Sequence, residues 1–161
     1  MGGIGLVIVI GAVIGSMGIA LYMYTEYQTN FIAVTAGEPV TVGPVEYIVI
    51  FDGTHMGNKD TQPENTFVKI IIEAKNISQE TTRMSGGQFY LIDEKEQKHE
   101  AVYGEFSKDD LYGDYLEPGK PTRWTTQFDV TYDETKQFDI VIRPTKEQST
   151  VDTAMICLTN C

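Results

Sequence analysis

The first 30 residues of this chain are almost wholly apolar and hold a single charged side chain, Glu26. The run from Ile4 to Tyr24 reads IGLVIVIGAVIGSMGIALYMY. As an α-helix it would extend roughly 30 Å, which is the thickness of the hydrocarbon core of a bilayer. Three tyrosines stand at its end, where aromatic residues gather at a membrane interface: Tyr22, Tyr24 and Tyr27. Residues 1–30 are therefore predicted to form one transmembrane helix with its interfacial flank.

A secretory signal peptide is the alternative interpretation of this segment. Signal peptides carry a basic region before a shorter apolar run, whereas the first basic residue of this chain is Lys59. A cleavage-like tripeptide, Val34–Ala36, lies well beyond the apolar run, and no cysteine near the start could carry a lipid. We therefore expect a retained helix and a single-pass protein of the cell membrane. The acidic remainder and the C-terminal cysteines favour an extracytoplasmic location for residues 31–161.

Small residues form two adjacent rows along the predicted helix. The first row is Gly11, Gly15 and Gly18, and the second is Ala12, Ser16 and Ala20. Such spacing lets helix backbones approach closely in lipid. The glycines are explained either by their general frequency in membrane helices or by packing. In the second case the partner is the helix of an integral membrane protein or another copy of this chain.

The charge of the remaining chain restricts its partners. The formal net charge is -11, and no stripe of Lys and Arg is present to neutralise phosphates. We therefore expect no binding to nucleic acid, and we expect the domain not to lie flat on anionic lipid. We expect the contact with membrane lipid to be made by the helix. The acidity is explained by the solubility of an exposed domain or by cation binding.

From Val40 onward the apolar residues recur with a period of two, which is typical of β-strands. Such runs cover Val40–Phe51 (around a Gly43-Pro44 break), Thr66–Asn76, Gln88–Asp93, Arg123–Thr131, Phe138–Arg143 and Val151–Leu158. Turn dipeptides such as Asp52-Gly53 and Pro118-Gly119 separate them. About seven short strands with such turns predict an all-β immunoglobulin-like sandwich behind one transmembrane helix.

Four motifs, in this order, are similar to those of the DUF4352, telokin-like family of secreted and lipid-anchored proteins. They are a strand ending in Lys75-Asn76, the strand Phe89–Asp93, the turn Leu116–Gly119 and the strand Phe128–Val130. The resemblance spans residues 40–143. It implies an immunoglobulin-like sandwich and says little about chemistry. Two features depart from the family, namely the acidic, aromatic segment Gly104–Tyr115 and the use of a protein helix as anchor.

The architecture as a whole also resembles archaeal type IV pilins, archaellins and archaellum stator-like proteins. In these proteins an apolar N-terminal helix leads directly into a β-sandwich. The short basic leader that a prepilin peptidase requires is absent from this sequence. The resemblance therefore implies a filament or stator subunit only for a chain that is already mature.

Cys157 and Cys161 are the only cysteines of the chain. In an extended strand their Cα atoms would lie roughly 13 Å apart, which is too far for a disulfide. A turn through Thr159-Asn160 would bring them into range. We expect a disulfide outside the cytoplasm, with free thiols, metal ligation and intermolecular pairing as alternatives.

Three other features could bear chemistry. His55-Met56 are copper-ligand types in a polar loop, but the cysteine of copper proteins is missing there, so exposed loop residues are expected. Asn76, followed by Ile77 and Ser78, forms an N-glycosylation acceptor at a strand end. The acidic segment has three interpretations: a solvated loop, a calcium-binding loop, or a loop that contacts a protein partner. The spacing of its carboxylates does not fit an EF-hand. The contact residues would then be Phe106, Asp110, Tyr112 and Tyr115.

No set of catalytic residues accompanies these features, and we expect no enzyme, no cofactor and no metal site. The favoured hypothesis is a structural or accessory subunit of a membrane protein assembly, with a further protein partner outside the cytoplasm. A pilin-like or archaellum-associated subunit is one alternative. An anchored ligand- or metal-binding domain is the other.

Overall fold

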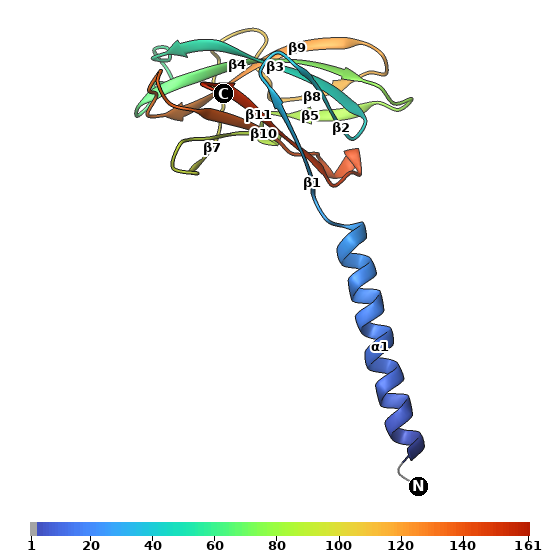
Figure 1. The fold of residues 1–161 in the computed structure, drawn as a ribbon. Helices are drawn as coiled ribbons and strands as arrows, with labels where there is room; N and C mark the ends of the chain where they lie inside the picture. The colour runs from blue at the N-terminus through green and yellow to red at the C-terminus, as the bar shows by residue number, and fades with distance from the viewer. Residues whose placement is uncertain (1–2) are drawn as a thin grey trace.

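An isolated apolar helix opens the structure, a computed structural model that describes residues 3–161. Met1 and Gly2 of the predicted anchor segment lie outside the described residues. Helix α1 spans Gly3–Glu26 and is about 36 Å long. It projects away from the rest of the protein (Figure 1), and its part from Val7 to Glu26 is long and apolar enough to cross a membrane. No side chain of that part is buried by the β domain.

Eleven strands follow within the described residues, so the predicted all-β class is confirmed. They are β1 (Asn30–Thr35), β2 (Pro39–Val42), β3 (Val45–His55), β4 (Thr66–Asn76), β5 (Thr82–Ser85), β6 (Phe89–Ile92), β7 (Lys98–Val102), β8 (Gly113–Leu116), β9 (Pro121–Val130), β10 (Phe138–Ile142) and β11 (Asp152–Thr159). Two short 3-10 helices, η1 (Gly86–Gln88) and η2 (Lys146–Gln148), precede β6 and β11.

The strands form two layers that one strand connects. The first layer has the order β1-β11-β10-β6 and the second the order β9-β4-β3-β2. β7 joins them, because its first residues pair with β6 and its last two, Ala101 and Val102, pair with β9. β5 and β8 form a separate two-stranded sheet. In Figure 1 the layer with β10 and β11 lies on the side of the helix, and the layer with β4 and β9 lies beyond it.

The core lies between the layers and follows the alternation of the sequence. In β4, Val68, Ile70 and Ile72 are fully buried. Their neighbours across β9 are Phe128, Thr126 and Trp124. Ile140 and Ile156, from β10 and β11, close the core from the first layer. Since alternate side chains of a strand point to opposite faces, the period of two fixes which residues meet here.

Four of the eleven strands were not predicted from the sequence. β5 and β8 are short and carry little alternation, and β7 begins with three polar residues, Lys98, His99 and Glu100. β1 follows α1 closely; its first residue, Asn30, falls in the predicted flank of the helix, and the others fall in the predicted domain before the first predicted strand. Its residues pair in parallel with β11, from Asn30 opposite Asp152 to Thr35 opposite Cys157. The strand begins one residue before the predicted domain boundary.

A buried polar cluster fastens η1 and η2 to the core. Gln88 donates through Nε2 to Oε1 of Gln148 at 3.0 Å, and Gln148 donates to the hydroxyl of Tyr47 at 3.3 Å. The backbone N–H of Thr145 also donates to Oε1 of Gln148. Burial raises the pKa of Tyr47 to about 12, although the hydrogen bonds from the two glutamines oppose this shift. The cluster gives hydrogen-bond partners to polar groups that are buried among apolar side chains.

Replacing Gln148 by Ala is expected to destabilise the domain by about 1–3 kcal/mol, since Gln88 and the Thr145 N–H then lose their buried partner. Denaturant unfolding followed by the fluorescence of Trp124, the only tryptophan, measures the change. The matched control is Glu147→Ala at the exposed neighbouring position, for which we expect a change within about 0.5 kcal/mol. Equal effects of the two substitutions would contradict this role of Gln148.

Candidate functional site

The largest hollow described on the β domain lies on the outer face of the first layer. Its volume is about 530 Å³. Apolar side chains form its floor, and carboxylates and one amide form its rim. The floor is Phe31, Tyr90, Ile92, Val141 and Met155, and the rim is Asp93, Glu94, Glu96, Gln137 and Asp139. We call it the outer groove.

Strand pairing brings the floor residues together. Met155 of β11 stands opposite Ala33 of β1 on one side and Val141 of β10 on the other. Val141 in turn stands opposite Tyr90 of β6. Directly opposed residues of neighbouring strands share one face of a sheet. Since Ile140 and Ile156 point into the core, this alternate set points outward.

The carboxylates of the outer groove gather at one end of the strands. Its acidic end comprises Asp93, Glu94, Glu96 and Asp139, near the start of β10. At Asp93, burial opposes ionisation, but hydrogen bonds from the Gln97 N–H and from His99 outweigh it and lower the pKa of the carboxyl. Two cations lie over the Tyr90 ring: Lys98 at 4.9 Å, which is ion-paired with Glu100 at 2.8 Å, and Arg143 at 5.5 Å, just beyond the end of β10.

Sequence reasoning missed the outer groove entirely. The available signal was the alternation in NFIAVT, residues 30–35, which predicts a strand with Phe31 and Ala33 on one face. The predicted strands began only at Val40, so this signal was not used. The partner strands were predicted, but their pairing order, which places β1 beside β11, is not readable from the sequence.

The predicted contact loop is divided by the structure into buried and exposed parts. Asp110 is only 8% exposed, so its predicted role as a contact residue is wrong. Its carboxylate accepts hydrogen bonds from the Phe106 and Ser107 N–H groups and from the Thr125 hydroxyl, at 2.7–2.9 Å. Burial opposes ionisation of Asp110, but these hydrogen bonds together lower its pKa. Asp110 thus holds the loop onto β9.

Phe106 also turns inward rather than toward a partner. Its ring lies 5.2 Å from that of Phe67 and 5.3 Å from that of His55. Nδ1 of His55 accepts the Gly57 N–H at 3.1 Å, while its buried Nε2 has no hydrogen-bond partner among the described residues. The pKa of His55 is lowered mainly by burial and to a smaller extent by the charge of Lys69. Of the His55-Met56 pair, expected to be exposed, only Met56 is exposed.

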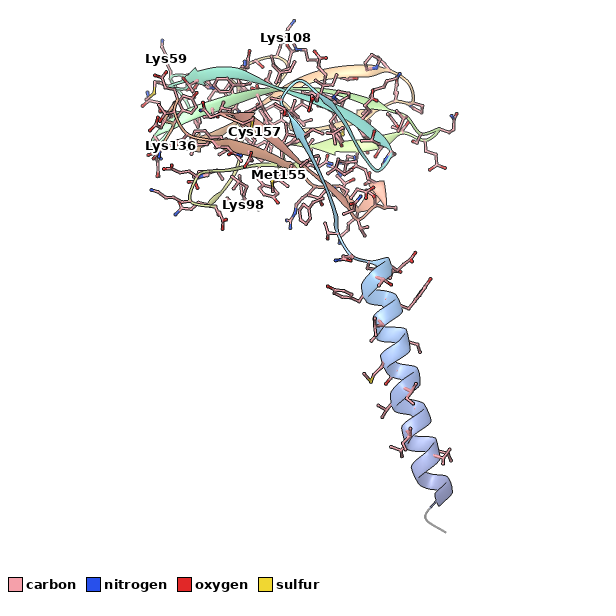
Figure 2. All side chains as sticks on the ribbon, viewed as in Figure 1. Lys59, Lys98, Lys108, Lys136, Met155 and Cys157 are labelled. Atoms are coloured by element: carbon pink, nitrogen blue, oxygen red, sulfur yellow. A yellow bond between two sulfur atoms is a disulfide. The ribbon has the colours of Figure 1, made fainter. Side chains whose placement is uncertain are left out.

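The tyrosines of this loop do reach the surface. Tyr112 and Tyr115 are exposed, and the ring of Tyr112 stacks with that of exposed Tyr103 at 6.2 Å. Figure 2 places Lys108, from the same loop, on the side of the sandwich away from the helix, and Lys98 on the side toward it. Tyr112 precedes β8 and Tyr115 lies in it, so both are beside the separate β5-β8 sheet, whereas the outer groove lies on the first layer.

The glycosylation prediction for Asn76 is contradicted by its burial. Asn76 has no exposed surface. Nδ2, the atom that would carry a glycan, donates to the carbonyls of Glu80 at 2.7 Å and Leu116 at 3.0 Å. Oδ1 accepts from the N–H and the hydroxyl of Ser78. The bonds to Ser78 and Glu80 close the turn after β4, and the bond to Leu116 joins this turn to β8.

The C-terminal disulfide is formed as expected. Cys157 and Cys161 are bonded with their Cα atoms 5.7 Å apart. The turn through Asn160 has a φ of 54°, and Nδ2 of Asn160 donates to the carbonyls of Glu134 and Lys136. The terminus is thereby fixed to the loop before β10.

The small-residue rows of α1 lie open. A Cβ atom at Gly11, Gly15 or Gly18 would meet nothing within 4 Å. Ala12, Ser16 and Ala20 are likewise exposed. No group of three or more His, Cys, Asp or Glu side chains suited to a metal ion is found in residues 3–161.

Together, these features define a class of protein: a β-sandwich domain carried behind an apolar N-terminal helix. The chain belongs to the DUF4352 family, a domain of unknown function, whose sequence profile matches residues 34–152. This confirms the family resemblance over a slightly longer stretch than predicted. The comparisons do not support the telokin-like name or the likeness to archaeal pilins and archaellum stator proteins. No curated protein matches the chain significantly.

Solved structures share the fold of the β domain. The yjhA protein of Bacillus subtilis is 19% identical with a TM-score of 0.61, over 79% of this chain and 99% of that one. MPT63, a secreted protein of Mycobacterium tuberculosis, is 11% identical with a TM-score of 0.61, over 81% and 98%. The ycdA protein of B. subtilis, described as a candidate lipoprotein, is 14% identical with a TM-score of 0.57, over 78% and 39%. These likenesses show the fold alone.

Replacing Asp110 by Asn is expected to cost about 1–3 kcal/mol of stability, because the amide presents a donor to the Phe106 and Ser107 N–H groups. The lowered pKa of Asp110 means that its ionised form stabilises the fold above the ordinary pKa of about 3.9 and that this contribution is lost as the pH falls through the folded value. Unfolding of both proteins across this range measures the difference, which should shrink in acid. The exposed neighbour, Asp109→Asn, is the control.

Expression in a glycosylating host is expected to leave Asn76 unmodified. The matched positive control is Gln79→Asn, which creates an acceptor with Glu80 and Thr81 on an exposed loop. Intact-mass analysis should show a glycan on the Gln79→Asn protein and none on the original chain. A glycan on Asn76 would mean that the modification precedes folding and that the carbonyls of Glu80 and Leu116 do not need their donor.

Proposed function

We propose that this chain is a single-pass membrane protein whose β-sandwich stands outside the cytoplasm as a structural or accessory subunit of a membrane assembly. Its role is binding and assembly rather than catalysis. The observation that carries the proposal is the uncovered helix α1, joined by only Tyr27–Thr29 to a folded domain.

The surface of α1 supports a packing role beyond anchoring. Its apolar side chains have no cover from the β domain, and water is not a suitable solvent for them. In a bilayer, small side chains allow close helix contacts. The open rows at Gly11, Gly15 and Gly18 are the part of α1 where another backbone can approach most closely.

The β domain offers a second contact surface outside the membrane. Tyr103 in the loop after β7, Tyr112 just before β8 and Tyr115 in β8 are exposed. Tyrosine is enriched at the centre of protein interfaces because it combines a large apolar ring with a polar tip. The candidate-lipoprotein and secreted descriptions of similar structures support an extracytoplasmic location for the domain.

Native purification of the full-length protein from its membranes tests the proposal. We expect the chain to resist alkaline extraction and to recover integral membrane partners in stoichiometric amounts. Gly15→Leu should lower partner recovery roughly tenfold, since close packing of this kind is worth about 1–2 kcal/mol. The control is Ile14→Leu at a position outside both small-residue rows.

A full-length protein that is extracted by alkali would refute the membrane anchor. A protein that stays in the membrane but behaves in mild detergent as a lone monomer without partners would refute the subunit role. A protein of which only copies of itself are recovered, as large polymers, would indicate a filament subunit instead.

A further inference from the structure

The corner of the sandwich nearest to the helix has a second hollow, of about 400 Å³. It shares Phe31 and Tyr90 with the outer groove and continues it toward the start of β1. Its other lining residues are Thr29, Arg143, Pro144, Thr150, Val151 and Thr153. We call this region the helix-proximal corner. Nothing in the proposed subunit role accounts for it.

A very short connection holds this corner close to the end of α1. Three residues, Tyr27–Thr29, separate Glu26 from the first residue of β1, and they span at most about 10 Å. Tyr27 still donates its N–H to the carbonyl of Met23, as in a helix. Asn30 Nδ2 donates to Asp152 Oδ1 at 3.2 Å and so holds the start of β1 on β11. Figure 1 shows the corner just beyond the helix end.

The corner exposes apolar side chains beside a cation. Phe31 is 62% and Val151 39% exposed, although both lie in a folded domain. The guanidinium of Arg143 lies over the Tyr90 ring and makes no ion pair within residues 3–161. Of the nearby carboxylates, Asp152 accepts from Asn30 and Thr150, whereas Glu147 lies on the exposed turn η2.

We propose that the helix-proximal corner docks onto the headgroup layer of the bilayer into which α1 inserts. Phe31 and Val151 enter the interface between headgroups and acyl chains, and Arg143 binds a lipid phosphate. This inference rests on the proposed membrane anchoring of α1. It adds a lipid-binding site that orients the domain on the membrane.

The bilayer is the occupant that the geometry favours. The tyrosines at the end of α1 mark the interface, and the connection keeps Phe31 within a few residues of it. Exposed aromatic side chains combined with Arg bind such an interface by apolar insertion and phosphate contact. The carboxylates Asp93, Glu94, Glu96 and Asp139 lie at the other end of the same face. They are therefore lifted away from the membrane, so the domain stands tilted rather than flat.

Environment-sensitive fluorophores on the full-length chain in phosphatidylcholine nanodiscs test the proposal. Both native cysteines are in a disulfide, so single introduced cysteines can be labelled selectively. The reporter is Val151→Cys, and the matched control is Glu96→Cys at the acidic end of the same face. A third label at Val13→Cys reports the insertion of α1. Nitroxide lipids, labelled either at the headgroup or in the acyl chain, serve as quenchers.

We expect headgroup nitroxides to quench the Val151→Cys label at least about twofold more than the Glu96→Cys label, since only the corner touches the interface. Phe31→Ser with Arg143→Gln should remove this difference while acyl-chain nitroxides still quench the Val13→Cys label. Equal, weak quenching at both domain positions with Val13→Cys quenched would overturn the corner contact and leave the anchor intact. Loss of quenching at Val13→Cys would refute the anchor itself.

The fluorophore at Val151→Cys could also change its emission only when each nanodisc holds two chains, without being quenched by headgroup nitroxides. That result would also overturn the proposal. The corner would then be covered by a second copy of the chain. Nanodiscs loaded with one chain each exclude this arrangement, so a quenched label in them supports the lipid contact.

Discussion

The parallel pairing of β1 with β11 is the contact on which the rest of the architecture depends. It joins the segment that leaves the helix to the last strand of the chain, so the N-terminal helix and the C-terminus are held by one sheet edge. The disulfide at the end of β11 and the Asn160 contacts to the preceding loop secure the same region. Because the connection to α1 has only three residues, any constraint on β1 becomes a constraint on how the domain stands relative to the helix.

The two layers use their outer faces differently. On the layer away from the helix, the loop after β7 covers β4 and β9, and Asp110, Phe106 and His55 hold it in place. This cover explains why Thr125 and Gln127 are buried although they alternate with core residues. On the layer toward the helix, Val141 is buried, but Phe31 and Met155 remain exposed beside the outer groove.

The sequence predicted the strands in which apolar residues recur with a period of two. β4 spans the predicted range Thr66–Asn76, and β6, β9, β10 and β11 differ from their predicted ranges by one or two residues. Prediction failed for two polar residues whose sequence pattern indicates one role while the folded side chain has another. Asn76 has the pattern of a glycan acceptor, yet its amide is consumed by the turn that follows β4. Asp110 appears among solvated carboxylates, yet four donors from its own loop and β9 surround it. Neither outcome is encoded in spacing along the chain.

The sequence by itself determined that this protein has an apolar helix long enough for a bilayer, an acidic all-β domain and a disulfide within reach of one turn. These properties follow from local composition and periodicity, because helix length, strand alternation and turn residues act over a few neighbours. Only the tertiary structure decided which polar residues are buried and which apolar residues stay exposed. The pairing order of the strands places β1 beside β11 and thereby brings Phe31, Tyr90, Arg143 and Val151 to one corner. That order depends on contacts between residues more than a hundred positions apart, such as Asn30 with Asp152, and no local pattern specifies them.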